Sequence, residues 1–280
     1  MVQKRLAHLL LLPGYILLVA TLLGPLVTTL VISLGNRAAN GGYDPSFTLS
    51  NFAAVNSRFS AFLNTIQLSA LGAAVCITIG IPVAFYIAKK LTVSRRYTAL
   101  FLVVSPFFTS FVARTYAWYF ALGGRGLPSI AQWLGLGQFR ILNTDFAVII
   151  GIVYAYLPIV ILTLFIAFDR ISDDLLEASS DLGRKPFETF FSVVIPLAMP
   201  GIISGYTLVF ILLSGEYLIP MLLGGGKVYF IGNAIVDLFL QSRNWPLGSA
   251  VAVVLMLLMI AAAVLSQLAQ HALNTDKRSR

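Results

Sequence analysis

The chain has 280 residues, of which 58% are hydrophobic and only 11% are charged. Soluble domains carry about 25% charged residues, so this composition excludes an ordinary soluble protein and predicts that lipid is the solvent. The net charge of +8 does not indicate nucleic acid binding, because the basic residues form short clusters between apolar runs without an RNA-binding aromatic motif. The single cysteine, Cys76, excludes an intrachain disulfide.

Six apolar windows are long enough to cross about 30 Å of hydrocarbon as helices. They cover residues 9–34, 62–88, 97–120, 146–168, 193–213 and 248–270. The first is too long for a signal peptide and has no small-residue cleavage site, so we expect a retained span. A further apolar stretch, 228–240, is too short to cross and contains Asp237, which predicts an interfacial or re-entrant helix. We therefore expect one all-α membrane domain over residues 1–280, with six core transmembrane helices.

Basic residues are divided unevenly between the two sets of connections. One set holds Lys4, Arg5, Lys89, Lys90, Arg95, Arg96, Arg170, Arg184, Lys185, Lys277, Arg278 and Arg280. The other set, in longer loops, holds Arg37, Arg58, Arg125, Arg140, Lys227 and Arg243. By the positive-inside rule, this excess in the first set predicts that both termini are cytoplasmic. Arg114 lies near the outer end of the third window, where we expect it to snorkel outward.

The connection between the fourth and fifth windows, residues 169–192, is unusually acidic and holds six of the eleven acidic residues. Ser172 is a suitable N-cap, and the two aspartates after it favour the positive end of a helix dipole. Gly183 can close the helix in a left-handed conformation, which predicts a short helix over 173–182. Pro186 suits the first position of a second helix, in which three phenylalanines recur at helical spacing.

The same connection carries a spaced motif. Glu177-Ala178-Ser179 is followed after three residues by Gly183 and after nine more by VVIP at 193–196. This pattern resembles the signature of ABC importer permeases, Glu-Ala-Ala, x3, Gly, x9, Ile-x-Leu-Pro, with every spacing kept. The resemblance implies the type I ABC importer permease fold, in which this loop forms the coupling helices that dock into a groove on an ATPase. It assigns ATPase coupling to Leu175, Glu177, Ala178, Ser179, Leu182, Gly183 and Pro196.

A narrower resemblance, to the first-type permease of spermidine/putrescine importers, covers most of the chain. It is carried by FFTSFVARTYAW at 107–118, IPLAMPGI at 195–202, LGG at 223–225, IGN at 231–233 and NWP at 244–246. The resemblance implies that the solute is a polyamine or a related amine. Importers of other small organic solutes share such stretches, so another solute stays open.

The resemblance also implies the partners. These are a second, similar permease, two cytoplasmic ATPases, an extracytoplasmic solute-binding protein and the lipid of a bacterial inner membrane. The chain has no phosphate loop of the form GxxxxGK[ST], so we expect it not to be an enzyme and to hold no cofactor, with ATP and Mg on the partner ATPase. His8 and His271 have no other ligands at metal spacing, and no metal site is expected. A secondary transporter is the rival, but inverted repeats and acidic relays within spans are not evident.

Five residues are candidates for the solute pathway. Glu216 and Asp237 are carboxylates in the connection between the fifth and sixth windows, and such groups are costly near lipid unless they face a cavity or a partner. The alternative is that both are interfacial, with Asp237 paired to a nearby arginine. Tyr217 beside Glu216, and Tyr116 with Trp118, could attract an ammonium group through their ring faces. The alternative for Tyr116 and Trp118 is the aromatic belt at the outer interface.

Overall fold

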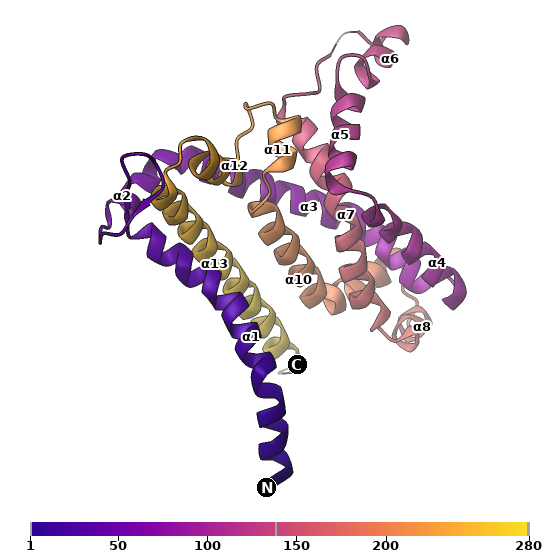
Figure 1. Cartoon of the computed structure of the whole chain (residues 1–280). Helices are drawn as coiled ribbons and strands as arrows, with labels where there is room; N and C mark the ends of the chain where they lie inside the picture. Colours follow the sequence, from indigo (N-terminus) through magenta and orange to yellow (C-terminus); the bar gives the residue numbers. More distant parts are fainter. Residues whose placement is uncertain (1, 138, 279–280) are drawn as a thin grey trace. The chain divides into compact units, whose positions relative to one another are not determined.

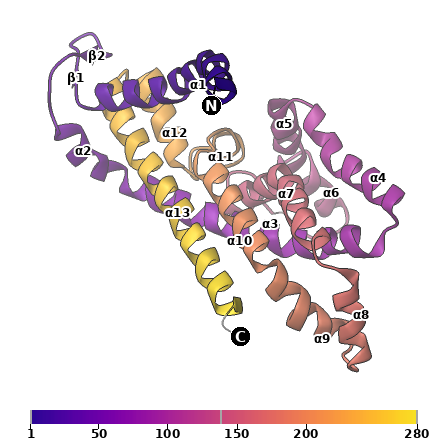
Figure 2. The ribbon, with the colours of Figure 1, turned by 90° about the horizontal axis from the view of Figure 1, so that it is seen from below.

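The structure, a computed structural model, describes residues 2–137 and 139–278, with the side chains of 11–137 and 139–273. Its regular structure is almost entirely helical (Figure 1, Figure 2). The chain divides into two compact units. One unit holds the chain up to Phe59 together with Ala234–Leu257, and the other holds Ser60–Asn233 and the residues from Leu258 onward.

Within the described residues, five helical segments are long and apolar enough to cross a membrane, and a bent pair makes a sixth if it counts as one span. The elements that form the five are α1 (Val2–Ser33), α2 (Ser50–Ala54) with η1 (Val55–Arg58) and α3 (Phe59–Lys90), α7 (Asp145–Asp169), α9 (Pro186–Thr189) with η3 (Phe190–Val194) and α10 (Ile195–Ser214), and α13 (Trp245–Arg278). Each overlaps one predicted window. The expected all-α membrane fold is confirmed.

The third window, 97–120, is not one straight helix in the structure. Its first part is α4 (Val93–Val104) with η2 (Ser105–Phe108), and its second part is α5 (Phe111–Leu122), followed by α6 (Leu127–Trp133). The two halves are bent by 87°. Pro106 lacks a backbone N–H and interrupts the helix, and the Ser110 side chain accepts from the N–H of Ala113 to begin α5.

The larger unit is built on α3, α7 and α10, which approach closely at small residues. A Cβ added to Gly201 of α10 would lie 2.3 Å from the Cβ of Ala167 on α7. A Cβ on Gly80 of α3 would lie 2.7 Å from the Cγ1 of Val160 on α7. Small residues at such crossings let helix backbones pack tightly in membranes. Figure 1 shows α11 (Leu218–Leu223) at one end of α7 and α8 (Asp173–Asp181) at the other.

The smaller unit contains α1, α2 and an antiparallel hairpin whose two strands have two residues each. The hairpin is not among the elements predicted from the sequence. The hairpin pairs β1 (Asn36–Arg37) with β2 (Tyr43–Asp44). Its apolar helix α1 leaves large side chains exposed, including Leu17 at 68%. Exposed apolar surface on this scale is what a lipid-facing helix presents.

The 228–240 stretch contains a short helix, as predicted, but not one that lies on an interface along its whole length. α12 (Ile231–Val236) continues into a π-helical turn, η4 (Asp237–Gln241). Phe230 and Ile231 are fully buried. An interfacial helix would leave an apolar face in lipid, so the start of this segment is a packed part of the protein.

Candidate functional site

The first helix of the acidic loop, residues 169–192, forms where local signals place it. The Ser172 hydroxyl accepts a hydrogen bond of 3.2 Å from the N–H of Asp174 at the start of α8. Gly183 has φ +83° and donates 2.8 Å to the carbonyl of Ser180, while Arg184 donates 3.2 Å to the carbonyl of Ser179. These two bonds form a Schellman motif, which ends the helix at the glycine. The predicted helix and its closing residue are confirmed.

The second helix of the loop, α9, is tied to the first by a buried hydrogen bond. Pro186 occupies its first turn, and the Glu188 carboxylate accepts 3.2 Å from the N–H of Lys185. The hydroxyls of Ser179 and Thr189 lie 2.9 Å apart, and both residues are buried. Ser179 therefore positions α8 against α9 rather than facing outward. Ser179 is the position at which the chain departs from alanine in the permease signature.

The acidic loop presents an exposed apolar face. Leu182 is 83% exposed and Phe187 is 74% exposed, with Leu175 and Phe191 also exposed. Glu177, Ala178 and Gly183 are exposed on the same loop, whereas Pro196 lies in the first turn of α10. Large apolar side chains grouped on the surface mark an interaction site.

Two ion pairs join the base of the acidic loop to the corner between α3 and α4. The Lys89 ammonium donates 2.8 Å to the Asp173 carboxylate and also donates to the carbonyl of Ile171. The Arg96 guanidinium pairs with Asp169 at 3.0 Å. The hydrogen bond from Lys89 lowers the pKa of the Asp173 carboxyl below its ordinary value, so this carboxyl is ionised at neutral pH. The sequence assigned Lys89 and Arg96 only to topology and did not predict these pairs.

Glu216 is buried and its carboxylate is fully engaged within the protein. One oxygen, Oε1, accepts from the N–H groups of Tyr217, Leu218 and Ile219 at 3.0, 2.8 and 3.3 Å. The other, Oε2, accepts 2.6 Å from the hydroxyl of Tyr156 on α7. The carboxylate thus satisfies N–H groups at the start of α11, which have no partner within the helix and of which that of Ile219 is buried. Sequence reasoning did not predict this capping role.

The segment around Glu216 is fixed by a second polar group. The Asn233 amide donates 2.8 Å to the carbonyl of Tyr217 and accepts 3.1 Å from the N–H of Phe230. The Thr65 hydroxyl on α3 accepts 2.8 Å from the N–H of Ile231. Tyr217 itself is 42% exposed, so its ring remains available to a solute.

Asp237 lies in the smaller unit, on η4. The Gln241 amide donates 2.9 Å to its carboxylate, four residues along the same turn. The structure therefore gives Asp237 and Glu216 different surroundings, one partly exposed and one buried in a hydrogen-bonded cap.

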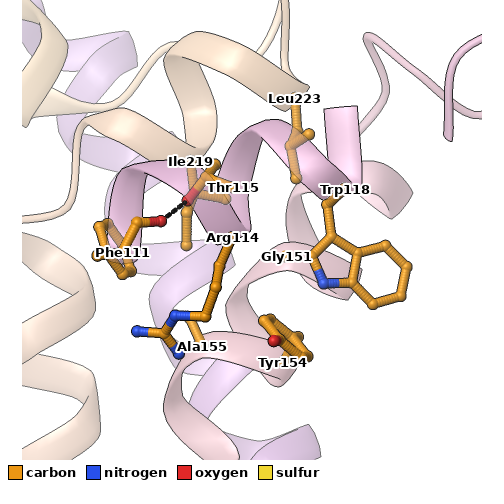
Figure 3. Close-up of a pocket in the computed structure, with 9 residues that line it drawn as sticks. All are labelled: Phe111, Arg114, Thr115, Trp118, Gly151, Tyr154, Ala155, Ile219 and Leu223. Carbon is orange, nitrogen blue, oxygen red and sulfur yellow. Dashed lines mark hydrogen bonds between the residues drawn. The ribbon is translucent and has the colours of Figure 1, made fainter. Parts of the chain in front are cut away.

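Arg114 lies on α5, one turn beyond the break, and its guanidinium packs on aromatic rings. Its Cζ atom is 5.3 Å from the centroid of Phe107, 5.8 Å from that of Phe111 and 6.0 Å from that of Tyr154 on α7. Figure 3 shows the side chain running between Phe111 and Tyr154. Two of its nitrogens, Nε and Nη1, are buried and have no hydrogen-bond partner among the described residues. Arg114 as a whole is partly exposed, so the expectation that it snorkels outward stays a prediction.

Trp118 shares this site and Tyr116 does not. The Trp118 indole packs edge-on against Tyr154 at 5.4 Å and lines the same small pocket as Arg114. Tyr116 is 44% exposed and contacts Tyr119 instead. Tyr154 could not be identified from the sequence, because an aromatic residue within a span usually serves packing and Arg114 lies 40 positions earlier in the chain.

The fold is that of a multi-span helical protein with an exposed pair of short helices between its fourth and fifth predicted spans. Residues 76–279 match the family of binding-protein-dependent transport system inner membrane components. The match covers well over half of the chain, so the chain belongs to this family. It is a multi-pass inner membrane protein and the permease subunit of an ABC importer.

Relatives of known identity support the same assignment. The chain is 40% identical over 240 residues to the spermidine/putrescine transport system permease protein PotB of Haemophilus influenzae, covering 84% of each chain. It is 36% identical over 218 residues to the PotB protein of Escherichia coli, covering 76% of this chain and 79% of that one. The narrower resemblance in the sequence is thereby confirmed.

Solved structures agree on the fold. The crystal structure of a bacterial ABC transporter involved in alginate import superposes with a TM-score of 0.73 at 18% identity, covering 95% of this chain and 96% of that one. An inward-facing MetNI methionine ABC transporter gives a TM-score of 0.55 at 17% identity, covering 77% and 95%. At these identities the likeness concerns the fold alone, which is that of type I ABC importer permeases.

Proposed function

We propose that this permease imports polyamines or a closely related amine, driven by two ATPases that dock on the acidic loop. A second permease subunit and an extracytoplasmic binding protein complete the assembly. ATP and Mg are bound by the ATPases, and this chain performs no hydrolysis.

The observation that carries the docking proposal is the exposed apolar face of the acidic loop. Burying a side chain such as Leu182 or Phe187 contributes roughly 1.5 to 3 kcal/mol each, so this face can hold a partner in place. The Lys89 and Arg96 ion pairs connect the loop to α3 and α4. A shift of the loop on ATP binding would therefore move the spans as a rigid body. Rigid-body movement is a common way for a protein to switch between two states, here open to the inside and open to the outside.

The solute proposal is supported by the PotB relatives, whose names state spermidine/putrescine transport. Asp237, Tyr217, Tyr116 and Trp118 are candidate contacts for the cation. Glu216 belongs to the same set, although its carboxylate must give up an internal hydrogen bond before it can meet a solute.

Solute choice can be measured by uptake in cells that lack their own amine importers. We expect cells that produce the whole assembly to take up labelled putrescine or spermidine, with each amine competing against the other. Methionine and alginate oligosaccharides should not compete. Uptake of a neutral or anionic solute with no uptake of either amine would reject the polyamine proposal and leave the family assignment intact.

The proposed orientation places both termini and the acidic loop in the cytoplasm, from the distribution of basic residues. An impermeant thiol reagent should label Ser46→Cys, which precedes α2, in intact cells. It should label Ser94→Cys, at the start of α4, only after the membrane is opened. The parent is a suitable background because its one cysteine, Cys76, is buried. Labelling of Ser94→Cys but not Ser46→Cys in intact cells would invert the topology.

A further inference from the structure

The guanidinium of Arg114 is held by ring faces and not by a carboxylate. Three rings surround it within about 6 Å, the range in which an aromatic face attracts a cation. No ion pair involves Arg114 among the described residues, and its Nε and Nη1 atoms lack hydrogen-bond partners there. Arg114 as a whole is partly exposed, but buried guanidinium nitrogens normally have an acid or another acceptor beside them, so the missing partner of Nε and Nη1 is the unusual feature of this site.

The three rings flank the break in the bent pair of helices. Phe107 lies in η2, just before the break, Phe111 is the first residue of α5, and Tyr154 faces them from α7. A broken helix exposes backbone polar groups, which are tolerated at membrane depth only where they are buried in protein or line a water-filled cavity. Discontinuous helices of this kind are where transporters place their solute sites.

We propose that Phe107, Phe111 and Tyr154 form an aromatic cage that binds an ammonium group of the solute, and that Arg114 occupies this cage until the solute displaces it. The inference rests on the proposed amine solute. It adds a binding site to that function and gives Arg114 the role of a resident cation that closes the site.

The space at the site requires such an exchange. The pocket beside the cage, lined by Trp118, Gly151 and Ile219 among others, has a volume of about 10 Å³, which is room for one water molecule at most. This pocket is too small to hold an ammonium group beside the guanidinium, so in the proposal the guanidinium leaves as the solute enters. The guanidinium and a solute ammonium carry like charges and would repel each other within the cage. The cage therefore does not bind the solute while Arg114 occupies it.

Displacement of Arg114 is feasible because it breaks no ion pair. An arginine fixed by a carboxylate would need a new partner for that acid, whereas here the rings simply exchange one cation for another. Arg114 lies one turn after the break in the sequence, and its long side chain can rotate toward water, as arginine side chains do at membrane edges.

The cage can be tested by emptying it and offering free cations. Trp118 packs on Tyr154, so its fluorescence reports on the cage once Trp133→Phe and Trp245→Phe remove the other two tryptophans of this chain, and the same assembly with Trp118→Phe supplies the signal of the partner proteins to be subtracted. In this background the purified assembly is titrated with methylguanidinium and with putrescine, for the parent, Arg114→Ala and Arg114→Gln. Arg125→Ala, which removes an exposed arginine, is the matched control.

We expect both Arg114 variants to respond to each cation at concentrations at least about tenfold lower than the parent and the Arg125→Ala control. The two cations should compete with each other. Adding Tyr154→Leu to Arg114→Ala should remove the gain. If one Arg114 variant does not assemble with the ATPases, the other supplies the same comparison.

The cage proposal is overturned if both cations act equally on the parent and on the Arg114 variants. It is also overturned if the parent responds to acetate and the variants do not, because Arg114 would then be a ligand for an acidic solute. Uptake of putrescine by the parent assembly is measured alongside. Its absence would remove the amine solute of the proposed function, while the methylguanidinium titration would still decide whether the cage binds cations.

Discussion

Replacing Gly183 with tryptophan is expected to reduce solute uptake at least about tenfold while the permease still reaches the membrane, because this glycine closes α8 at the centre of the proposed docking face. Gly183 has φ +83°, a conformation that costs a residue with a side chain roughly 1 to 2 kcal/mol. No atom lies within 4 Å of where its Cβ would be, so the indole would project outward from the loop. It would separate the loop from an ATPase without disturbing the packed spans. Uptake and recovery of the ATPase with the tagged permease measure the effect.

A closely matched control exists at the end of α6. Gly135 has φ +76°, has no atom near its Cβ position, and closes its helix with the same pair of hydrogen bonds as Gly183. Gly135→Trp should therefore carry the same backbone strain and leave ATPase recovery unchanged. Gly183→Asn, which tolerates the left-handed conformation, should retain most of the uptake. Normal uptake and ATPase binding in Gly183→Trp would show that the docking assignment is wrong.

Replacing Glu216 with alanine is expected to destabilise the permease rather than only slow transport. The change removes the acceptor of three N–H groups, of which that of Ile219 is buried and the other two are partly buried, and of the partly buried Tyr156 hydroxyl. Each buried group left without a partner costs roughly 1 to 3 kcal/mol, so the total is on the order of 3 kcal/mol or more. We expect the apparent melting temperature of the detergent-solubilised protein to fall by roughly 5 to 10 °C. Asp145→Ala, which removes an exposed carboxylate from the first turn of α7, should change it little.

Glu216→Gln separates the capping role from a role in the solute pathway. Glutamine keeps one acceptor oxygen for the α11 N–H groups, so stability should largely return. If uptake also returns, the carboxylate charge is not needed by the solute. A stable Glu216→Gln protein that has lost amine uptake, together with a similar loss in Asp237→Asn, would instead support both acids as pathway residues. An unchanged melting temperature in Glu216→Ala would contradict the capping account.

The spans and the acidic loop could be predicted because the signals that form them are local. The helix at 173–181 has its N-cap at Ser172 and its left-handed residue at Gly183, so twelve neighbouring positions contain all the signals that form it. Spans are recognised by apolar length, which lipid enforces. Hydropathy does not predict the bend in the third window, because the sequence around Pro106 stays apolar on both sides of the bend.

The side-chain contacts that define the candidate sites could not be predicted, because they join distant positions. Lys89 meets Asp173 across 84 positions, and Tyr156 meets Glu216 across 60. Apolar composition predicts that the spans are helices but does not predict which faces of the helices pack together. From the sequence, Lys89 can therefore be assigned only to topology, and Glu216 has no predicted partner within the protein. Glu216 is the clearest example: the sequence allows a solute contact or an interfacial carboxylate, and neither interpretation includes the hydrogen bonds that begin α11.

The central claim, that this permease carries an amine under the control of ATPases docked on the acidic loop, is tested most directly in the purified assembly. The tagged permease is isolated with its partners, placed in lipid nanodiscs, and assayed for ATP hydrolysis with the binding protein and a panel of solutes. We expect the ATPase to co-purify, and putrescine or spermidine to stimulate hydrolysis only when the binding protein is present. A permease that purifies without an ATPase and moves solute on an ion gradient alone would contradict the account.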